Sequence, residues 1–282
     1  MTFASSSFHR TAVVAAERTP LELDESAVIE YWDERSTTYS CAVCEEIEGD
    51  LYHEWDQILR QRTADVRGVA ARQERIPRVL DLGCGPGFFE ILFARMDCAV
   101  DAVDVSAGMI EQARRNNAQA GTLDRVRFHE SDVSRLPFQD DQFDIVVLRN
   151  VTWLMRDPLA AYEEWRRVLI PGGKLLVFDA NWYRYLASPA ANAQRIIDEA
   201  SSFVSRSDVN GSASDDQETR CEQIALSLPF TYIDRPQWDV AALEQLGFVD
   251  TLVDDQVWKR VWTEGEQSFY GSSPLFMVEA TK

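Results

Sequence analysis

The stretch that decides the fold is VLDLGCGPG at residues 79–87, a short apolar run that ends in three closely spaced glycines. A glycine-rich turn after a strand lets the backbone approach a ligand, and the next helix begins with N–H groups that are available for binding. The glycine spacing is G-x-G-x-G, with Pro86 in the fourth position, whereas dinucleotide-binding turns have the spacing G-x-G-x-x-G. The turn therefore favours a nucleoside that carries no phosphate over a pyrophosphate.

The residues around this turn alternate between strand-like and helix-like patterns. Strands are predicted at residues 78–82, 98–103, 126–129, 143–148 and 174–178, with helices at 87–96 and 107–118. A third helix is predicted from Pro158 behind the capping residue Asp157, and Pro171-Gly172-Gly173 is expected to end it. Its expected buried face comprises Ala161, Trp165, Val168 and Leu169. Such repeated units predict a Rossmann-like α/β fold, a mostly parallel sheet with helices on both faces.

The rest of the chain is predicted to add helical lid segments to this core. Between the last of these strands and the chain's end lie a helix at 190–203 that starts at Ser188-Pro189, a polar loop at 205–217 and a helical turn at 222–228. This connection is too long to be a simple loop. A helix near 240–246 and strands near 248–253 and 275–280 follow. The expected segments are a loose tail at 1–22, an N-terminal helical cap at 23–72, a cofactor-binding core at 73–180, a helical lid insertion at 181–236, and a closing helix and strands at 237–282.

Composition limits the classes of partner. The net charge of -19 opposes binding to nucleic acid, since such binding needs a basic surface, and it favours a small neutral or cationic molecule. No apolar run approaches the ~18 residues that span a bilayer, and residues 12–16 are too short for a signal-peptide core, so a cytoplasmic protein that does not insert into membranes is expected. Cys41 and Cys44 have the spacing of a redox or metal pair but lack a second pair, so ordinary helical thiols and no metal site are expected. The oligomeric state stays open.

Two acidic residues follow predicted strands at positions suited to a nucleoside. Asp104 ends a strand that begins after the glycine turn, and a carboxylate there can accept both ribose hydroxyls. Its alternative role, a helix cap, is already filled by Ser106. Asp132 follows the third strand and is suited to the adenine amino group, with Val133 against the ring; capping of a turn is the alternative for Asp132.

Five ordered motifs carry a resemblance to a known family. They are VLDLGCGPG (79–87), AVDVS (102–106), ESDVSRLPF (130–138), FDIVVLRN (143–150) and WRRVLIPGGKLLVFD (165–179). Together they resemble the class I S-adenosylmethionine-dependent methyltransferases over residues 76–180. The resemblance implies a seven-stranded sheet with an antiparallel final hairpin and S-adenosylmethionine as cofactor. It places Asp81, Gly83 and Gly85 at the methionine portion, Asp104 with the adjoining Val105 at the ribose, Asp132 and Val133 at the adenine, and Asn150 beside the sulfonium methyl group, where it is also a catalytic candidate.

The segment YWDERSTTY at 31–39 also resembles the helical cap of small-molecule members, in which an aromatic hydroxyl reaches the cofactor. Tyr39 is the preferred residue for this role and Tyr31 the second, with plain packing as the alternative for each. His53 is the one plausible general base, and its alternative is an exposed helix histidine. Trp153, Trp182 and Tyr183 are expected to bind a flat, apolar or cationic substrate.

The predicted function is methyl transfer from S-adenosylmethionine to an oxygen, nitrogen, sulfur or carbon atom of a small molecule, mainly by positioning and desolvation. A catalytically silent regulator or partner protein that binds the same cofactor is the alternative. A nicotinamide-dependent oxidoreductase is disfavoured by the glycine spacing. A metal-dependent catechol type is disfavoured because no matching acidic cluster accompanies the motifs.

Overall fold

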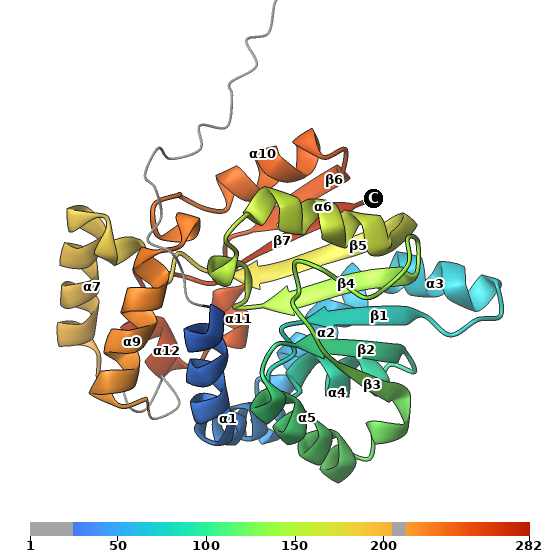
Figure 1. Cartoon of the computed structure of the whole chain (residues 1–282), viewed down its shortest axis with the longest axis horizontal. Coiled ribbons are helices and arrows are strands. Elements are labelled where there is room, and N and C mark those ends of the chain that lie inside the picture. Colours follow the sequence, from blue (N-terminus) through green and yellow to red (C-terminus); the bar gives the residue numbers. More distant parts are fainter. Residues whose placement is uncertain (1–24, 205–212) are drawn as a thin grey trace, which may run out of the picture.

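A computed structural model describes residues 25–204 and 213–282, and the strands within them form one seven-stranded sheet in the order β3-β2-β1-β4-β5-β7-β6 (Figure 1). The strands from β3 to β5 pair in parallel, and β7 is antiparallel to both β5 and β6. The predicted Rossmann-like sheet with an antiparallel final hairpin is therefore confirmed. The strands are β1 Arg78–Leu82, β2 Ala99–Asp104, β3 Val126–Glu130, β4 Phe143–Arg149, β5 Leu169–Asp179, β6 Val249–Asp254 and β7 Phe276–Thr281.

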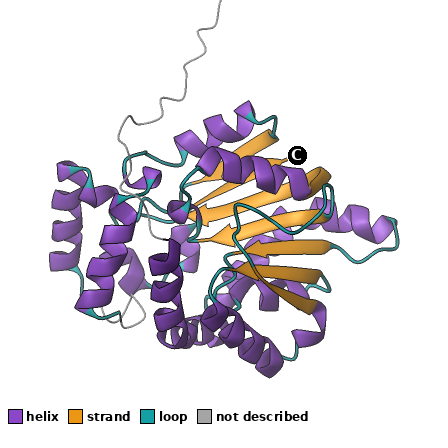
Figure 2. Ribbon diagram, in the orientation of Figure 1, coloured by secondary structure: helices purple, strands orange, loops and turns teal. Residues whose placement is uncertain are grey.

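Helices cover both faces of the sheet and extend past one edge of it (Figure 2). The arrowheads of β4 and β5 point toward α1, α9 and α12, so these helices stand at the carboxyl ends of the strands (Figure 1). The helices are α1 Glu25–Glu48, α2 Tyr52–Arg62, α3 Ala64–Arg72, α4 Phe88–Ala94, α5 Ala107–Ala120, α6 Pro158–Val168, α7 Pro189–Ser201, α9 Asp215–Leu226, α10 Gln237–Gln245, α11 Trp258–Val261 and α12 Glu264–Phe269. Single 3₁₀ turns are η1 Leu123–Arg125, η2 Thr152–Leu154, η3 Arg184–Leu186 and η4 Pro229–Thr231.

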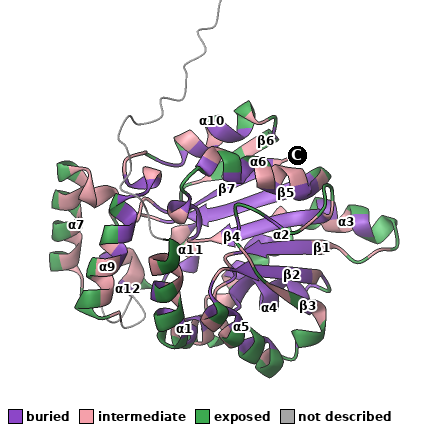
Figure 3. Ribbon diagram, viewed as in Figure 1, coloured by how far each residue is buried: buried purple, intermediate pink, exposed green. Residues whose placement is uncertain are grey.

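Alternate residues of each central strand enter different cores, because successive side chains in a strand point to opposite faces. In β1, Val79 packs with α2, α3 and α4 on one face, whereas Leu80 packs with α6 and α10 on the other. Both faces of the central strands β1, β2 and β4 are buried, whereas the edge strand β6 and the outer sides of helices such as α5 and α7 are exposed (Figure 3). Strands buried on both faces explain why the sequence shows continuous apolar runs there.

Two predicted boundaries were wrong. The helix that was expected to continue through Leu169 ends at Val168, and β5 already includes Leu169 and the Pro171–Gly173 run. The chain tolerates Pro171 there because the pairing of β5 with β4 shifts register before Lys174. The helix expected at 222–228 is longer, because Ser214 starts α9 at Asp215 through a capping box with Gln217.

Two further predicted segments lie wholly or partly outside the residues that the structure describes. The expected tail at 1–22 and positions 205–212 of the expected polar loop are not among the described residues. Within the described residues, no helix is both long enough and apolar enough to cross a bilayer.

A fully buried network of charged side chains joins the 181–236 insertion to the core. Arg235 donates to both carboxylate oxygens of Asp239, at 2.6 and 2.9 Å, and to Asp179 Oδ2 at 3.0 Å. The hydroxyl of Thr152 also donates to Asp179, and that of Tyr162 to Asp239. The three charged side chains are completely excluded from solvent, so the charge of Arg235 and the charges of the two carboxylates must neutralise each other.

Replacing the cation of this network is expected to be costly. Arg235→Met leaves Asp179 and Asp239 buried without their cation, which should lower the free energy of unfolding by about 3–5 kcal/mol in urea titrations. Asp234→Ala is the matched control one position earlier, since the pair of Asp234 with Arg184 is largely solvated, and it should cost less than about 1 kcal/mol. Equal losses in the two variants would contradict this account.

Candidate cofactor and acceptor site

The glycine turn after β1 lies directly against the residue that follows β4 by two positions. Gly83 has φ +62°, and a Cβ atom added there would lie only 2.4 Å from Cγ2 of Val151. No side chain fits between the two turns, so glycine is required both by the backbone angle and by the close approach. The register that pairs β1 with β4 brings these turns together.

Gly87, at the end of the turn, allows two helices to pack closely. A Cβ atom at this position would lie 3.0 Å from Nδ2 of Asn117 and 3.2 Å from Cα of Ala113, both on α5. Its φ of +99° also favours glycine. Gly87, the third glycine of the turn, thus lets α4 pack against α5.

Asp104 lies at the end of β2 and holds the glycine turn in place. Its Oδ2 accepts from the backbone N–H of Gly85, and its Oδ1 accepts from the backbone N–H of Ser106, both at 2.9 Å. Burial raises the pKa of Asp104, and these N–H donors oppose the shift. Ser106 caps α5 by accepting from Met109 N, as predicted, so the carboxylate of Asp104 is not the cap. Each oxygen of a carboxylate has two lone pairs, so Asp104 can accept from these N–H groups and from ribose hydroxyls at the same time.

Beneath the turn, Asp81 and Glu90 form a pair of buried carboxyl groups. Asp81 is 2% exposed and Glu90 is fully buried. In ionised form, Asp81 Oδ2 and both Glu90 oxygens have no hydrogen-bond partner. Burial, together with the neighbouring Glu90, raises the pKa of Asp81 well above its usual range, and burial raises that of Glu90 to about 7. Glu90 was not among the predicted site residues, although one acidic residue within the apolar run FFEILFA was a visible signal.

Asn150 follows β4 and has φ +60°, a left-handed conformation that asparagine tolerates better than most residues. Its backbone N–H donates to Phe178 O at 2.9 Å, and its carbonyl accepts from Trp153 Nε1 at 2.9 Å. Its side-chain Oδ1 is buried and has no partner, and the residue lines the adjacent cavity. An amide group with spare bonding capacity thus lies between the glycine turn and the cavity.

The long helix α1 covers the glycine turn. Asp33 Oδ1 accepts from Ser106 Oγ at 2.5 Å and from Gly108 N at 2.9 Å. Further along α1, Asn116 of α5 donates to Ser40 Oγ, and it also donates to the carbonyl of Pro86 within the turn. Cε1 of Tyr39 lies 3.9 Å from the position of a Cβ atom on Gly85. Asn116 of α5 therefore links the cap to the turn through hydrogen bonds to both.

A cavity of about 900 Å³ opens beside Asn150 at the carboxyl ends of the strands. Its wall is rich in aromatic rings, and it has six carboxylates against three cationic groups. The aromatic residues are Trp32, Tyr39, Trp55, Trp153, Trp182, Tyr183, Tyr185, Trp262, Phe269 and Tyr270, and the charged ones are Glu45, Glu46, Asp50, Glu199, Glu264, Glu266, Arg149, Arg195 and Lys259.

All three predicted substrate-binding residues line this cavity. Trp153 packs against Tyr183 with ring centroids 4.7 Å apart, and Tyr183 Oη lies 2.9 Å from Cys221 Sγ. Trp182 packs against Trp262 and Tyr270, and its indole nitrogen is buried without a partner. Tyr39 and Asn150 line the cavity as well.

Two predicted residues, Tyr31 and His53, do not line this cavity. Tyr31 is buried in a separate cluster with Cys221 and Trp153, because α1 turns it toward α9 and away from the glycine turn. His53 is exposed on α2 and is not among the residues that line the cavity. The face of α2 that carries Trp55 enters the core, and this leaves His53 toward solvent. These surroundings match the packing alternative for Tyr31 and the exposed alternative for His53, and the roles first expected of them stay predictions.

The contacts of Asp132 match its alternative role in a turn. Asp132 is exposed, and its Oδ1 accepts from the backbone N–H and the hydroxyl of Ser134, both at 2.8 Å. Val133 is buried against the core cluster that contains Leu80, and Val105 is half-buried after β2. Adenine binding by Asp132 and Val133, and contact with the cofactor by Val105, stay predictions.

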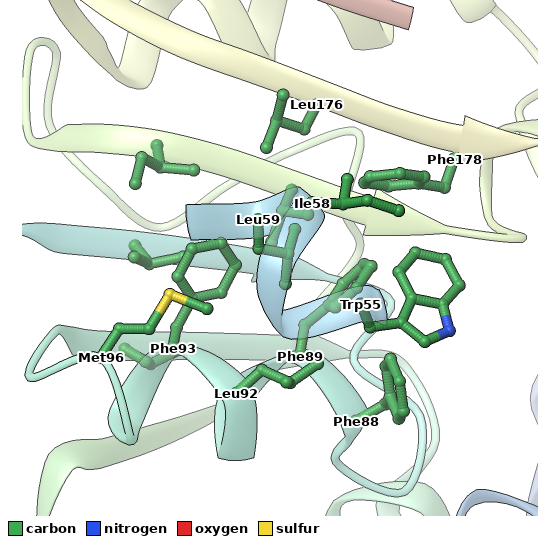
Figure 4. Close-up of a cluster of buried hydrophobic side chains, with 14 of the residues drawn as sticks. Trp55, Ile58, Leu59, Phe88, Phe89, Leu92, Phe93, Met96, Leu176 and Phe178 are labelled. Carbon is green, nitrogen blue, oxygen red and sulfur yellow. The ribbon is translucent and has the colours of Figure 1, made fainter. Parts of the chain in front are cut away.

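Sequence reasoning missed a charged group at the inner wall of the cavity. Arg149 donates to Glu46 Oε1 at 2.6 Å, and its guanidinium lies 4.1 Å from the ring centroid of Phe88. Phe88 belongs to the aromatic cluster around Trp55 (Figure 4). The residues of α11 and α12 that line the cavity were missed too, because four- and six-residue helices are too short to show a helical period.

The two cysteines with metal-like spacing lie in α1. Cys41 is exposed, and the Cys44 thiol donates to Asn116 Oδ1 at 3.4 Å. Within residues 25–204 and 213–282, no group of three or more histidine, cysteine or acidic side chains is arranged to hold a metal ion.

Residues 80–177 match the family model described as a methyltransferase domain. This stretch includes the end of β1, the glycine turn, Asp104, β4 and most of β5. Over these residues the chain is similar to a methyltransferase domain. The resemblance that the five motifs carried is confirmed, and the cofactor of this family is S-adenosylmethionine.

Curated relatives are similar over the same region. The chain is 39% identical over 120 residues to a demethylmenaquinone methyltransferase from Clavibacter sepedonicus, covering 41% of this chain and 45% of the relative. It is 31% identical over 170 residues to a 27-O-demethylrifamycin SV methyltransferase from Amycolatopsis mediterranei, covering 59% and 55%. The aligned stretches thus span about half the length of these relatives.

Solved structures share the fold at low sequence identity. A Galdieria sulphuraria protein provisionally named sarcosine dimethylglycine methyltransferase has a TM-score of 0.53 and 14% identity, over 81% of this chain and 84% of that one. The geranyl diphosphate C-methyltransferase from Streptomyces coelicolor, in complex with Mg²⁺, geranyl-S-thiolodiphosphate and S-adenosyl-L-homocysteine, has a TM-score of 0.50 and 16% identity, over 77% and 75%.

The contact between the two turns predicts the effect of alanine at Gly83. Gly83→Ala should lower the free energy of unfolding by about 1–2 kcal/mol through the strain of positive φ. The overlap of its Cβ atom with Val151 should lower it by about 1–3 kcal/mol more. Gly121→Ala is the matched control, because Gly121 also has positive φ (+71°) but no atom lies within 4 Å of its Cβ position. Urea unfolding should show the larger loss of stability for Gly83→Ala. Combining Gly83→Ala with Val151→Ala should cost less than the sum of the single changes, and simple additivity would contradict the clash.

Proposed function

We propose that this chain is an S-adenosylmethionine-dependent methyltransferase that acts on a small molecule. The observation that carries the proposal is the junction of the turns after β1 and β4. It places Asp81, Asp104 and the glycine turn on one side of Asn150 and an aromatic cavity on the other. A cofactor on the first side and an acceptor on the second meet at Asn150.

The cofactor fits the polar groups that the protein leaves without partners. The buried Oδ atoms of Asp81 and Asn150 lack donors, and buried polar groups in native proteins are nearly always bonded. Asp104, Val105, Asp132 and Val133 would hold the nucleoside, with Tyr39 closing the site above Gly85. When bound, the cofactor supplies a methyl group on a positively charged sulfur.

The contribution of this chain to the reaction is positioning and exclusion of water. Asn150 orients the groups at the junction, and Trp153, Trp182 and Tyr183 hold the acceptor. Fixed alignment of two reactants is worth effective molarities of about 10⁵ M or more in favourable cases. Where the acceptor must lose a proton, the cavity offers Glu266, whose pKa burial raises, in place of His53.

The acceptor class follows from the wall of the cavity. Within it, Arg149 is paired with Glu46 and Arg195 with Glu199, so the remaining charge is mainly negative. A neutral or cationic, partly apolar acceptor suits this wall, since aromatic faces attract both flat rings and cations. The relatives named above have different acceptors in their names, a demethylmenaquinone and a demethylrifamycin, so they support the reaction class without fixing the acceptor.

The cap and the insertion are proposed to act as lids over this site. Arg220 of α9 pairs with Glu34 of α1 at 2.6 Å, which joins the 181–236 insertion to the 23–72 cap. Tyr31, Trp153 and Ile224 form one apolar cluster that joins both segments to the core. Exposed ion pairs are weak, so the Arg220–Glu34 pair can break at small cost, and the apolar cluster is the main contact that opposes separation of the cap from the insertion.

Calorimetry with S-adenosylhomocysteine tests the cofactor site. The wild-type chain should bind it, and Asp104→Ala should weaken binding at least about tenfold, since both ribose hydroxyls lose an ionised acceptor. Asp124→Ala, which removes an exposed carboxylate from η1, is the control and should bind as the wild type does. Absence of wild-type binding, or unchanged binding by Asp104→Ala, would overturn the proposal.

A product screen with thiols, amines and phenols, followed by mass spectrometry, separates an enzyme from a silent regulator. With the acceptor found, Trp182→Ala should raise its KM about tenfold, the equivalent of ~1.4 kcal/mol of lost ring contact, with little change in binding of S-adenosylhomocysteine. Trp238→Ala is the matched control, because Trp238 packs on the opposite face of the sheet. A KM that changes equally in both variants would show that Trp182 does not contact the acceptor.

A further inference from the structure

Glu90 is the most anomalous polar residue of the site. It is fully buried in α4, and neither of its carboxylate oxygens has a well-formed hydrogen bond. The Cys84 thiol and the helix backbone oppose the rise in its pKa only in part. Its neighbours are the carboxyl group of Asp81 at the end of β1, the Cys84 thiol in the glycine turn and the carboxylate of Asp104 at the end of β2. A buried charge that is left in this way needs an explanation, because burial without compensation costs several kcal/mol.

The nearby cation, Arg149, offsets only part of the negative charge of the Asp81–Glu90 pair. Arg149, at the end of β4, lowers the pKa of Asp81, but its guanidinium donates to Glu46 at 2.6 Å and lies over the ring of Phe88. Two carboxyl groups this close together cannot both ionise in a dry environment, so one retains a proton. At least one of the two carboxyl groups therefore keeps its proton in the free chain, in keeping with the raised pKa values of Asp81 and Glu90.

We propose that Glu90 is a second carboxyl group for the ammonium end of the cofactor, and that the Asp81–Glu90 pair releases its retained proton to solvent when an α-ammonium group binds at the glycine turn. The inference rests on the proposed cofactor site. The resemblance assigns Asp81 to the methionine portion, whereas the part played by Glu90 and by the proton comes from the buried pair itself. A cation beside the pair stabilises its second negative charge, which in the free chain has no counter-ion of its own.

The consequence is a dependence of cofactor affinity on pH. An ammonium ligand must expel the proton that the pair retains in order to bind, so its affinity rises with pH through the range around the pKa of Glu90, about 7. The titratable groups that face Glu90 are Asp81, Cys84 and Asp104, and the cation Arg149 lies beside Asp81. Burial raises the pKa of each of these three acidic groups. A ligand without the ammonium group gains nothing from the ionised pair.

The test compares two ligands on the full chain. S-adenosylhomocysteine carries the α-ammonium group, and 5′-methylthioadenosine has the same nucleoside without it. Isothermal calorimetry from pH 5.5 to 8.5, in buffers of different ionisation enthalpy, should show release of about half a proton to one proton near pH 7 for the first ligand and almost none for the second. Correspondingly, the Kd of S-adenosylhomocysteine should fall by up to about tenfold per pH unit below pH 7, while that of 5′-methylthioadenosine stays flat.

Glu90→Gln distinguishes a role in binding from a role in structure. This variant should weaken S-adenosylhomocysteine about tenfold at pH 8, flatten its pH dependence, and leave 5′-methylthioadenosine unchanged. Asp144→Asn is the matched control, since Asp144 is an equally buried carboxylate whose partner is Arg75, away from the glycine turn. It should lose stability but keep the pH dependence and the preference for the ammonium ligand.

Each remaining outcome counts against the inference. Equal pH slopes for the two ligands in the wild type overturn it, and this comparison holds even if Glu90→Gln does not fold. A Glu90→Gln variant that keeps the wild-type slope, or that loses both ligands equally, also overturns it. Binding of neither ligand by the wild type overturns the proposed function as well, whereas binding of both without a difference in slope leaves that function standing.

Discussion

The constraint on which the site depends is the contact between the turn after β1 and the turn after β4. These strands are parallel neighbours, so their carboxyl ends meet at one edge of the sheet. Gly83 and Val151 approach so closely that no side chain fits at Gly83. The same contact places Asn150 between a carboxylate-lined turn and an aromatic cavity. In an open α/β sheet this edge is where ligands bind, because loops from several strands converge there.

The protein buries ionisable side chains in two places, and their charges are neutralised in only one of them. Arg235 is completely buried, but Asp179 and Asp239 compensate it, and the result is a fixed link between core and insertion. Asp81 and Glu90 are equally buried, but Arg149 is already paired with Glu46. A compensated network stabilises one arrangement, whereas an uncompensated pair keeps a capacity to bind a cation.

Most of the fold and the cofactor half of the site could be predicted, because their signals are local. An apolar run followed by glycines marks a strand and its turn, and Asp157-Pro158 marks a helix start. Asp104 and Asn150 follow strands, so topology places them at the ligand-binding edge. The acceptor half was predicted less well. Tyr31 and Tyr39 lie on the same helix with similar surroundings in sequence, and only Tyr39 lines the cavity.

From the sequence alone, the positions of the core strands and of the glycine turn along the chain followed, because periodicity, spacing and capping act between residues close in the chain. The class of cofactor followed from the resemblance of five motifs to a known family. Only the tertiary structure decided which groups face each other across elements. It paired Arg149 with Glu46, brought α11 and α12 to the cavity, and set Glu90 beside Asp81. Such contacts depend on the packing of helices against the sheet, and on how buried charges are compensated, which no local pattern records. The glycine turn could thus be identified from the sequence, while the carboxyl pair beneath it could not.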